Sequence, residues 1–233
     1  MRAPAERNIN YPRLARTITV VVVLFFCPAV FFLLILKLSG LRQLSQSSFY
    51  ITTALHWVGL ILLWLYSVKI EKRPLLIWEE HRYPFSNYIK FILLLFVILY
   101  VGIAVIHLVL VAAHLNTISS RLTEMTVIFK QNKLLLVFVA LTAGITEELA
   151  IRGYLQPRLE LVFSNSWTAI LISSVLFGLL HFGYGTIMNM IGPFFIGLVF
   201  AYFYSKYRNI KVLIVAHFLW DFLVLLLLIR SPH

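Results

Sequence analysis

The segment that decides the fold is LLLVFVALTAGITEELAIRGYL, residues 134–155, in which two adjacent glutamates interrupt a long apolar run. About 20 predominantly apolar residues form a helix that crosses the roughly 30 Å hydrocarbon core of a bilayer. A charged side chain at the centre of such a helix costs about 2.5–3.5 kcal/mol on insertion scales. We therefore expect Glu147 and Glu148 to lie within protein or against a water-filled cavity, which makes them the first candidate functional residues.

The whole chain has the composition of a membrane protein. Of its 233 residues, 61% are hydrophobic and 12% are charged, whereas a soluble domain carries about 25% charged residues. We predict an all-α, polytopic transmembrane bundle of about seven spans with a polar cavity inside the membrane. The predicted spans are 17–38, 50–68, 88–112, 134–155, 167–185, 187–204 and 210–229. The first three form an N-terminal region, 1–133, and the last four form a core, 134–230.

The net charge of +11 follows from the way basic residues are distributed between the two faces of the membrane. The segments 1–16, 69–90, 156–166 and 205–211 contain thirteen Lys and Arg, and the segments that alternate with them contain five. The positive-inside rule then predicts a cytoplasmic N-terminus in a cell membrane, with membrane lipid as a partner and no nucleic acid. Seven hydrophobic helices supply enough packing for a monomer, and the single cysteine is expected to be a packing residue.

Titratable residues inside the predicted spans are spaced so that they share helix faces. Glu148 and Arg152 are separated by four residues, as are His217 and Asp221, and such pairs lie next to each other on a helix surface. Glu147 projects about 100° away from Glu148 around the helix axis. We therefore expect Glu148 to pair with Arg152 and Glu147 to be left free.

His181, in the fifth predicted span, completes the polar set. At about 1.5 Å of rise per residue, Glu147, His181 and His217 are expected to lie at comparable depths and to converge on one cavity in the cytoplasmic half of the bilayer. One interpretation of the set is a buried ion-pair network that holds the bundle together. A working site explains it better, because three carboxylates beside Arg152 leave two negative charges in excess, an imbalance typical of functional sites.

The residue types in this set permit hydrolysis by an activated water. A carboxylate and a histidine can make a trapped water nucleophilic, and a second histidine can donate to the oxyanion that forms. Glu147, His181 and His217 also match a His₂Glu zinc site, so a zinc-dependent hydrolase is an alternative, but no HExxH motif is present and we expect no metal. The two other histidines within spans, His56 and His107, have no acidic neighbour in sequence and are expected to be hydrogen-bonded packing residues.

Three motifs, in this order, resemble those of the CPBP family, the CAAX proteases and bacteriocin-processing enzymes also called the Abi family. EELAIR at 147–152 resembles the family's EExxxR motif, FGLLH at 177–181 its FxxxH motif, and HFLWD at 217–221 its HxxxN or HxxxD motif. The resemblance covers residues 134–228 and implies a glutamate-type intramembrane endopeptidase related to the CAAX protease Rce1. The implied substrate is a membrane-anchored or prenylated CAAX-type peptide, cut from the cytoplasmic side.

The resemblance also implies a role for each residue of the set. Glu147 would be the general base that activates water, with His181 as its partner, and Glu148 and Arg152 would support and orient the site.

His217 and Asp221 would occupy the oxyanion-stabilising positions. An ionised aspartate accepts hydrogen bonds and donates none, so Asp221 would have to be protonated there or would orient His217. Some members of this family act in bacteriocin immunity or as membrane scaffolds, which makes a non-catalytic protein of that kind the second alternative.

Overall fold

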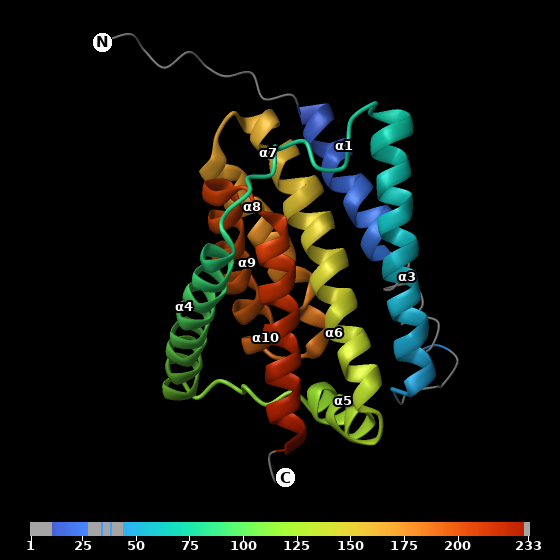
Figure 1. The fold of residues 1–233 in the computed structure, drawn as a ribbon. Helices are drawn as coiled ribbons and strands as arrows, with labels where there is room; N and C mark the ends of the chain where they lie inside the picture. Colours follow the sequence, from blue (N-terminus) through green and yellow to red (C-terminus); the bar gives the residue numbers. More distant parts are fainter. Residues whose placement is uncertain (1–10, 28–33, 35–37, 39–43, 231–233) are drawn as a thin grey trace.

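The computed structural model describes residues 11–27, 34, 38 and 44–230, and in these residues the chain forms helices and no strand. Six helical segments within this part of the chain are long and apolar enough to cross a membrane (Figure 1). They are Gln46–Ile70, Phe85–Ala112, Lys133–Phe163, Ser166–Tyr184, Met188–Tyr207 and Ile210–Arg230. Each coincides with one of the spans predicted from residue 50 onward, so the all-α, polytopic membrane architecture is confirmed.

The first predicted span, 17–38, is only partly covered by the structure. Helix α1 (Tyr11–Val21) continues as a π-helical turn, η1 (Val22–Phe26), which packs against helix α3 (Gln46–Leu65). Most of the remainder of this span lies outside the described residues. Phe25 is fully buried in a core cluster that also includes residues of α3 and of the span that carries the two glutamates.

The glutamate-bearing span is longer than its sequence indicates. Helix α6 (Lys133–Glu148) runs through a π-helical segment, η3 (Leu149–Leu155), into α7 (Gln156–Phe163), and ends at Ser164, whose φ of 50° lies in the left-handed region. The predicted end at residue 155 is therefore wrong. The helix continues because its polar residues are satisfied by tertiary contacts: Arg158 donates to Glu71 at 2.8 Å and Gln156 donates to the Ala201 carbonyl at 2.9 Å.

A short helix, α5 (Ser120–Gln131), lies across one end of the bundle, where the sequence had been interpreted as a loop (Figure 1). Ser119 caps its N-terminus by accepting a hydrogen bond from the Leu122 backbone N–H at 3.2 Å. At about 1.5 Å per residue, its twelve residues are too few to cross a membrane. The helix instead buries Met125 and Phe129 against α6 and α10 (Ile210–Arg230).

The opposite end is tied together by the loop between the π-helical turn η2 (Tyr66–Ile70) and helix α4 (Phe85–Ala112). Glu80 in this loop accepts hydrogen bonds from the Tyr204 hydroxyl and from the backbone N–H of Ile210, both at 2.6 Å. These contacts join the end of α9 (Met188–Tyr207) to the start of α10. The loop therefore fixes the ends of the two helices that line the site described next.

Two glycines allow the site helices to approach closely. A Cβ added at Gly144 on α6 would lie 2.9 Å from the backbone nitrogen of Phe218 on α10. A Cβ added at Gly178 on α8 (Ser166–Leu180) would lie 2.9 Å from the carbonyl oxygen of Met190 on α9. Both distances are shorter than real Cβ contacts, so α6 is held directly against α10, and α8 directly against α9.

Candidate active site

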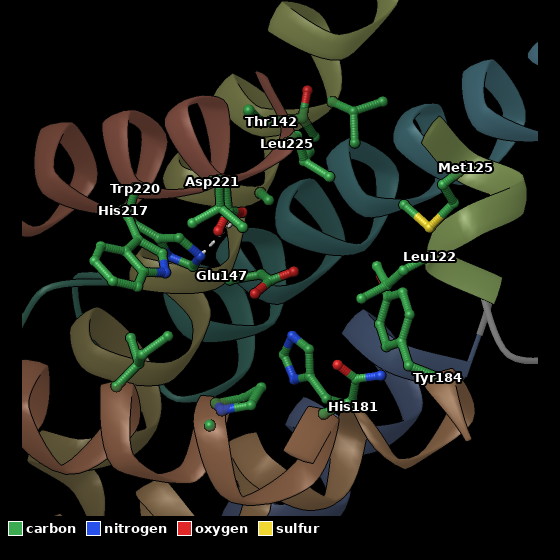
Figure 2. Close-up of a pocket in the computed structure, with 18 of the residues that line it drawn as sticks. Leu122, Met125, Thr142, Glu147, His181, Tyr184, His217, Trp220, Asp221 and Leu225 are labelled. Carbon is green, nitrogen blue, oxygen red and sulfur yellow. Dashed lines mark ion pairs between the residues drawn. The ribbon is translucent and has the colours of Figure 1, made fainter. Parts of the chain in front are cut away.

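A cavity of about 360 Å³ lies among the helices and collects most of the predicted site residues (Figure 2). Glu147 comes from α6, His181 from the end of α8, and His217 and Asp221 from α10. Residues of α3, α4, α5 and α9 complete its lining, which is largely apolar. Four of the six predicted residues thus face one space, although they come from three helices that are separate in sequence.

Glu147 is the carboxylate that faces the cavity. Its side chain and the His181 ring point toward one another across this space (Figure 2). Its Oε2 atom is buried and has no hydrogen-bond partner among the described residues. The expectation that helix geometry leaves Glu147 free of the neighbouring ion pair therefore agrees with its position.

The ring of His181 is held in one orientation by its own helix. His181 is the C-cap residue of α8, and its Nδ1 atom donates to the Phe177 carbonyl oxygen at 2.8 Å. In a neutral imidazole only one nitrogen carries a proton. The bond to Phe177 therefore leaves Nε2 of the neutral ring as an acceptor. The ring also lies nearly parallel to that of Tyr184, with 6.0 Å between centroids.

Glu148 is the centre of a buried polar network. Its Oε1 atom accepts one hydrogen bond from Arg152 Nη1 at 2.9 Å and another from His217 Nδ1 at 2.7 Å. Glu148 and Arg152 are both fully buried. The guanidinium group of Arg152 also lies over the Phe177 ring, 4.3 Å from its centroid, a cation–π contact that stabilises a buried cation.

The pair of Glu148 and Arg152 was expected from their spacing, but the contact of Glu148 with His217 was not. His217 was associated only with Asp221, four residues further on the same helix. That contact also exists, with 3.4 Å between His217 Nε2 and Asp221 Oδ2 (Figure 2). Each nitrogen of the ring thus faces a carboxylate, and the doubly protonated ring donates to both at once.

The position of the cavity corrects its expected depth. The site was predicted in the cytoplasmic half of the bilayer, from the rise per residue along each predicted span. Helix α8 ends at Leu180, and η4 (Phe182–Tyr184), which follows His181, contacts α5; α5 lies across one end of the bundle (Figure 1). The cavity extends from Glu147 toward this end, where Leu122 and Met125 of α5 line it.

The comparison with protein families identifies the part of the chain that holds this site. Residues 129–223 match the family model of type II CAAX prenyl endopeptidases. This segment is Rce1-like. The match includes all three motifs and so confirms the resemblance found in the sequence. The comparisons with curated proteins and with solved structures gave no significant match. The segment that holds the site is thus similar to proteases of the CAAX endopeptidase type, and it lies in a bundle of helices that are long and apolar enough to cross a membrane.

The alternative of a zinc site does not fit the Rce1-like segment. Within the described residues, no three His, Cys, Asp or Glu side chains are grouped closely enough to hold a metal ion. In addition, His217 directs both ring nitrogens at the carboxylates of Glu148 and Asp221. A histidine binds a metal through a nitrogen lone pair, so a metal at His217 would have to displace one of these two contacts.

The cavity also contains polar residues that the sequence interpretation did not include in the site. His56 lines it from α3, with Nδ1 donating to the Thr52 carbonyl at 2.8 Å, whereas His107 is exposed on α4. Asn189 lines it from the first turn of α9, and its Nδ2 atom is buried without a partner among the described residues. Asn189 could have been selected from the sequence, because it is a polar amide side chain within a predicted span.

Proposed function

We propose that this protein is an intramembrane endopeptidase in which Glu147 and His181 activate a water molecule for attack on a peptide bond. The observation that carries the proposal is the arrangement of these two side chains. A carboxylate that has no ion pair with any described residue faces a histidine whose Nδ1 proton is fixed by the Phe177 carbonyl. General base catalysis needs a free acceptor within reach of water, and the cavity between Glu147 and His181 provides space for it.

The first step forms a bond between the water oxygen and the carbonyl carbon. A proton of the water moves to the carboxylate of Glu147, while Nε2 of His181 accepts a hydrogen bond from the other O–H. The π electrons of the carbonyl bond move to its oxygen, which becomes the oxyanion. The C–N bond then breaks, and the leaving nitrogen takes the proton from Glu147. This returns the carboxylate and releases a carboxylic acid and an amine without a covalent intermediate.

Two donors at the cavity wall are suited to stabilise the oxyanion. His217 Nε2 makes only a long contact of 3.4 Å with Asp221, so its N–H can be shared with a substrate oxygen that lies beside this contact, without a rotation of the ring. The amide nitrogen of Asn189 has no hydrogen-bond partner among the described residues, and rotation by about 180° about the terminal side-chain bond exchanges the positions of the amide nitrogen and oxygen. Asp221, as a carboxylate, orients His217. Arg152 and Glu148 hold the other nitrogen of the same ring in place.

The lining of the cavity defines the class of substrate in this proposal. Most of the lining side chains are apolar, among them Met125, Ile196, Trp220 and Leu228. An extended peptide next to an apolar membrane anchor, including a prenylated CAAX-type end, fits such a surface. The proposed enzyme is a monomer in a cell membrane, with membrane lipid around it and no nucleic-acid partner. The charge distribution supports a cytoplasmic N-terminus.

The test compares the peptides of cells that express the wild-type protein with those of cells that express Glu147→Gln, His181→Ala or Glu124→Gln. Glu124 is exposed on α5 and serves as the matched control for the loss of a carboxylate. We expect the same cleavage products to disappear with the first two variants and to persist with the control. Products that persist in both site variants would exclude this mechanism. Equal membrane levels of all four proteins separate lost catalysis from lost folding and from a purely scaffolding role.

A further inference from the structure

A second cavity, of about 690 Å³, lies between α1, the turn η2 with the loop that follows it, and α7, and it shares no lining residue with the active-site cavity. Helices α1 and α7 contact each other, and their labelled ends lie at the same end of the bundle (Figure 1). Arg16, Arg73 and Arg158 line this cavity, and Glu71 is the acidic residue of its lining. A cavity of ligand-binding size thus has more positive than negative groups in its wall.

Arg158 forms the buried wall of this cavity and has no donor left for a ligand. Its Nε atom donates to Glu71 Oε2 at 2.8 Å, in an ion pair that offsets the charge of both groups. Its Nη1 and Nη2 atoms donate at 2.7–3.1 Å to the Ser67 hydroxyl and to the carbonyl oxygens of Pro74, Leu75 and Tyr154. A guanidinium group has five N–H donors, and these five hydrogen bonds use all of them.

The same network fixes the backbone at Arg73. The Ser67 hydroxyl donates to the Arg73 carbonyl oxygen at 2.9 Å, and the Arg73 N–H donates to the Ser67 carbonyl oxygen at 3.0 Å. The side chain of Arg73 is exposed and makes no ion pair with any described residue. Its backbone is therefore held in place while its guanidinium group stays available to a ligand.

Arg16 lines the cavity from a different element, helix α1. It is also exposed, and it too has no ion-pair partner in the part of the chain that the structure describes. The planar guanidinium group matches the geometry of a phosphate and binds it through two parallel hydrogen bonds. Two unpaired arginines from two elements at one cavity are therefore suited to a phosphate group.

The cavity lies at the ends of membrane-spanning segments. Ile70, which lines it, is the last residue of the segment Gln46–Ile70, and Arg158 lies five residues before the end of Lys133–Phe163. The ends of such segments lie near the polar headgroup region of a bilayer. Basic pockets between spanning helices bind anionic headgroups there.

We propose that this cavity binds a phosphate group through Arg16 and Arg73, and that the phosphate belongs to the headgroup of an anionic membrane lipid. A zwitterionic headgroup fits less well, because its ammonium group would need a carboxylate. The charge of Glu71 is offset by Arg158, and its other oxygen accepts from the Tyr154 hydroxyl at 2.8 Å. A bound lipid would join α1 to the loop 71–84, and this role does not depend on the proposed peptidase activity.

The test is a titration of the purified protein, in an uncharged detergent, with phosphatidylglycerol, phosphatidylcholine or inorganic phosphate. A ligand that binds only the folded protein raises its Tm. The site variant is Arg16→Gln/Arg73→Gln, and the matched control is Arg82→Gln/Lys211→Gln, which removes two exposed cations that do not line the cavity. Both variants lose the same charge, so a general attraction to anionic lipid affects them equally.

We expect phosphatidylglycerol to raise the Tm of the wild type and of the control, and phosphatidylcholine to have a much smaller effect. For the site variant, the concentration that gives half of the rise should be at least about 10-fold higher, since hydrogen bonds to charged groups are lost. If that variant is unstable without ligand, Arg16→Gln and Arg73→Gln are measured singly, and each should give an intermediate value.

The other outcomes contradict the proposal in part or as a whole. If inorganic phosphate raises Tm in a way that depends on the two arginines and phosphatidylglycerol does not, the phosphate site stands and the lipid source is wrong. Equal responses of the site variant and the control to every ligand would overturn the site. An equal rise with phosphatidylcholine and phosphatidylglycerol would overturn the selectivity for an anionic headgroup.

Discussion

The two adjacent glutamates should respond in opposite ways to the same substitution. Glu148→Gln removes a fully buried charge that accepts hydrogen bonds from both Arg152 and His217. Breaking a buried ion pair by removing one partner costs about 3–5 kcal/mol. Glutamine keeps one acceptor oxygen, so we expect the lower value, about 3 kcal/mol. For a chain of 233 residues, this corresponds to a decrease in Tm of about 6–12 °C.

Glu147→Gln should leave the thermal stability unchanged or slightly higher. Glu147 has no ion pair among the described residues, and removing an unpaired, half-buried charge removes a desolvation cost. The assay is thermal unfolding of the purified proteins in one detergent, with Glu124→Gln as the exposed control, together with cleavage activity. We expect Glu147→Gln to be folded and inactive. An unchanged Tm for Glu148→Gln, or an equal decrease for both variants, would refute the assignment of separate roles.

Two further substitutions test the geometry of the site. Gly144→Ala should slow cleavage about 10²-fold and lower Tm, because the added Cβ would lie 2.9 Å from Phe218 N and move α10 away from α6. Gly183→Ala is the control, because a Cβ added there meets nothing within 4 Å. A cleavage rate of Gly144→Ala equal to that of the wild type would contradict the argument. Asn189→Leu should lower kcat about 10²–10³-fold at unchanged KM and Tm if its amide stabilises the oxyanion. Asn116→Leu is the exposed control, and a kcat equal to that of the wild type would remove Asn189 from the mechanism.

The sequence predicted the features that depend on local patterns. Apolar run lengths located the six described spans, and the four-residue spacing predicted the contact of Glu148 with Arg152. It failed where polar residues are satisfied by distant partners. Arg158 looked like a loop residue because the sequence does not show that Glu71 and backbone carbonyls of the preceding loop surround its guanidinium group. Helix α5 was missed for the related reason that a short helix at the end of a bundle has no long apolar run.

The contacts between helices could not be predicted, because the sequence does not give the register of one helix against another. The bond between His217 and Glu148 depends on the direct contact of α6 with α10, which in turn depends on the missing side chain at Gly144. The position of Asn189 beside the cavity similarly follows from the close approach of α8 and α9. Both glycines are visible in the sequence, but their role appears only when the opposing backbone is placed.

The structure also changes the balance of charge that first indicated a functional site. From the sequence, three carboxylates faced one arginine, with two negative charges in excess. The contacts of His217 with Glu148 and Asp221 add a second group to the cluster that can carry a positive charge. When that ring is doubly protonated, two carboxylates, a guanidinium and an imidazolium neutralise one another. The single uncompensated charge is that of Glu147, the only one of the three carboxylates that faces His181 across the cavity. The buried network therefore leaves the negative charge at the position where a water would be deprotonated.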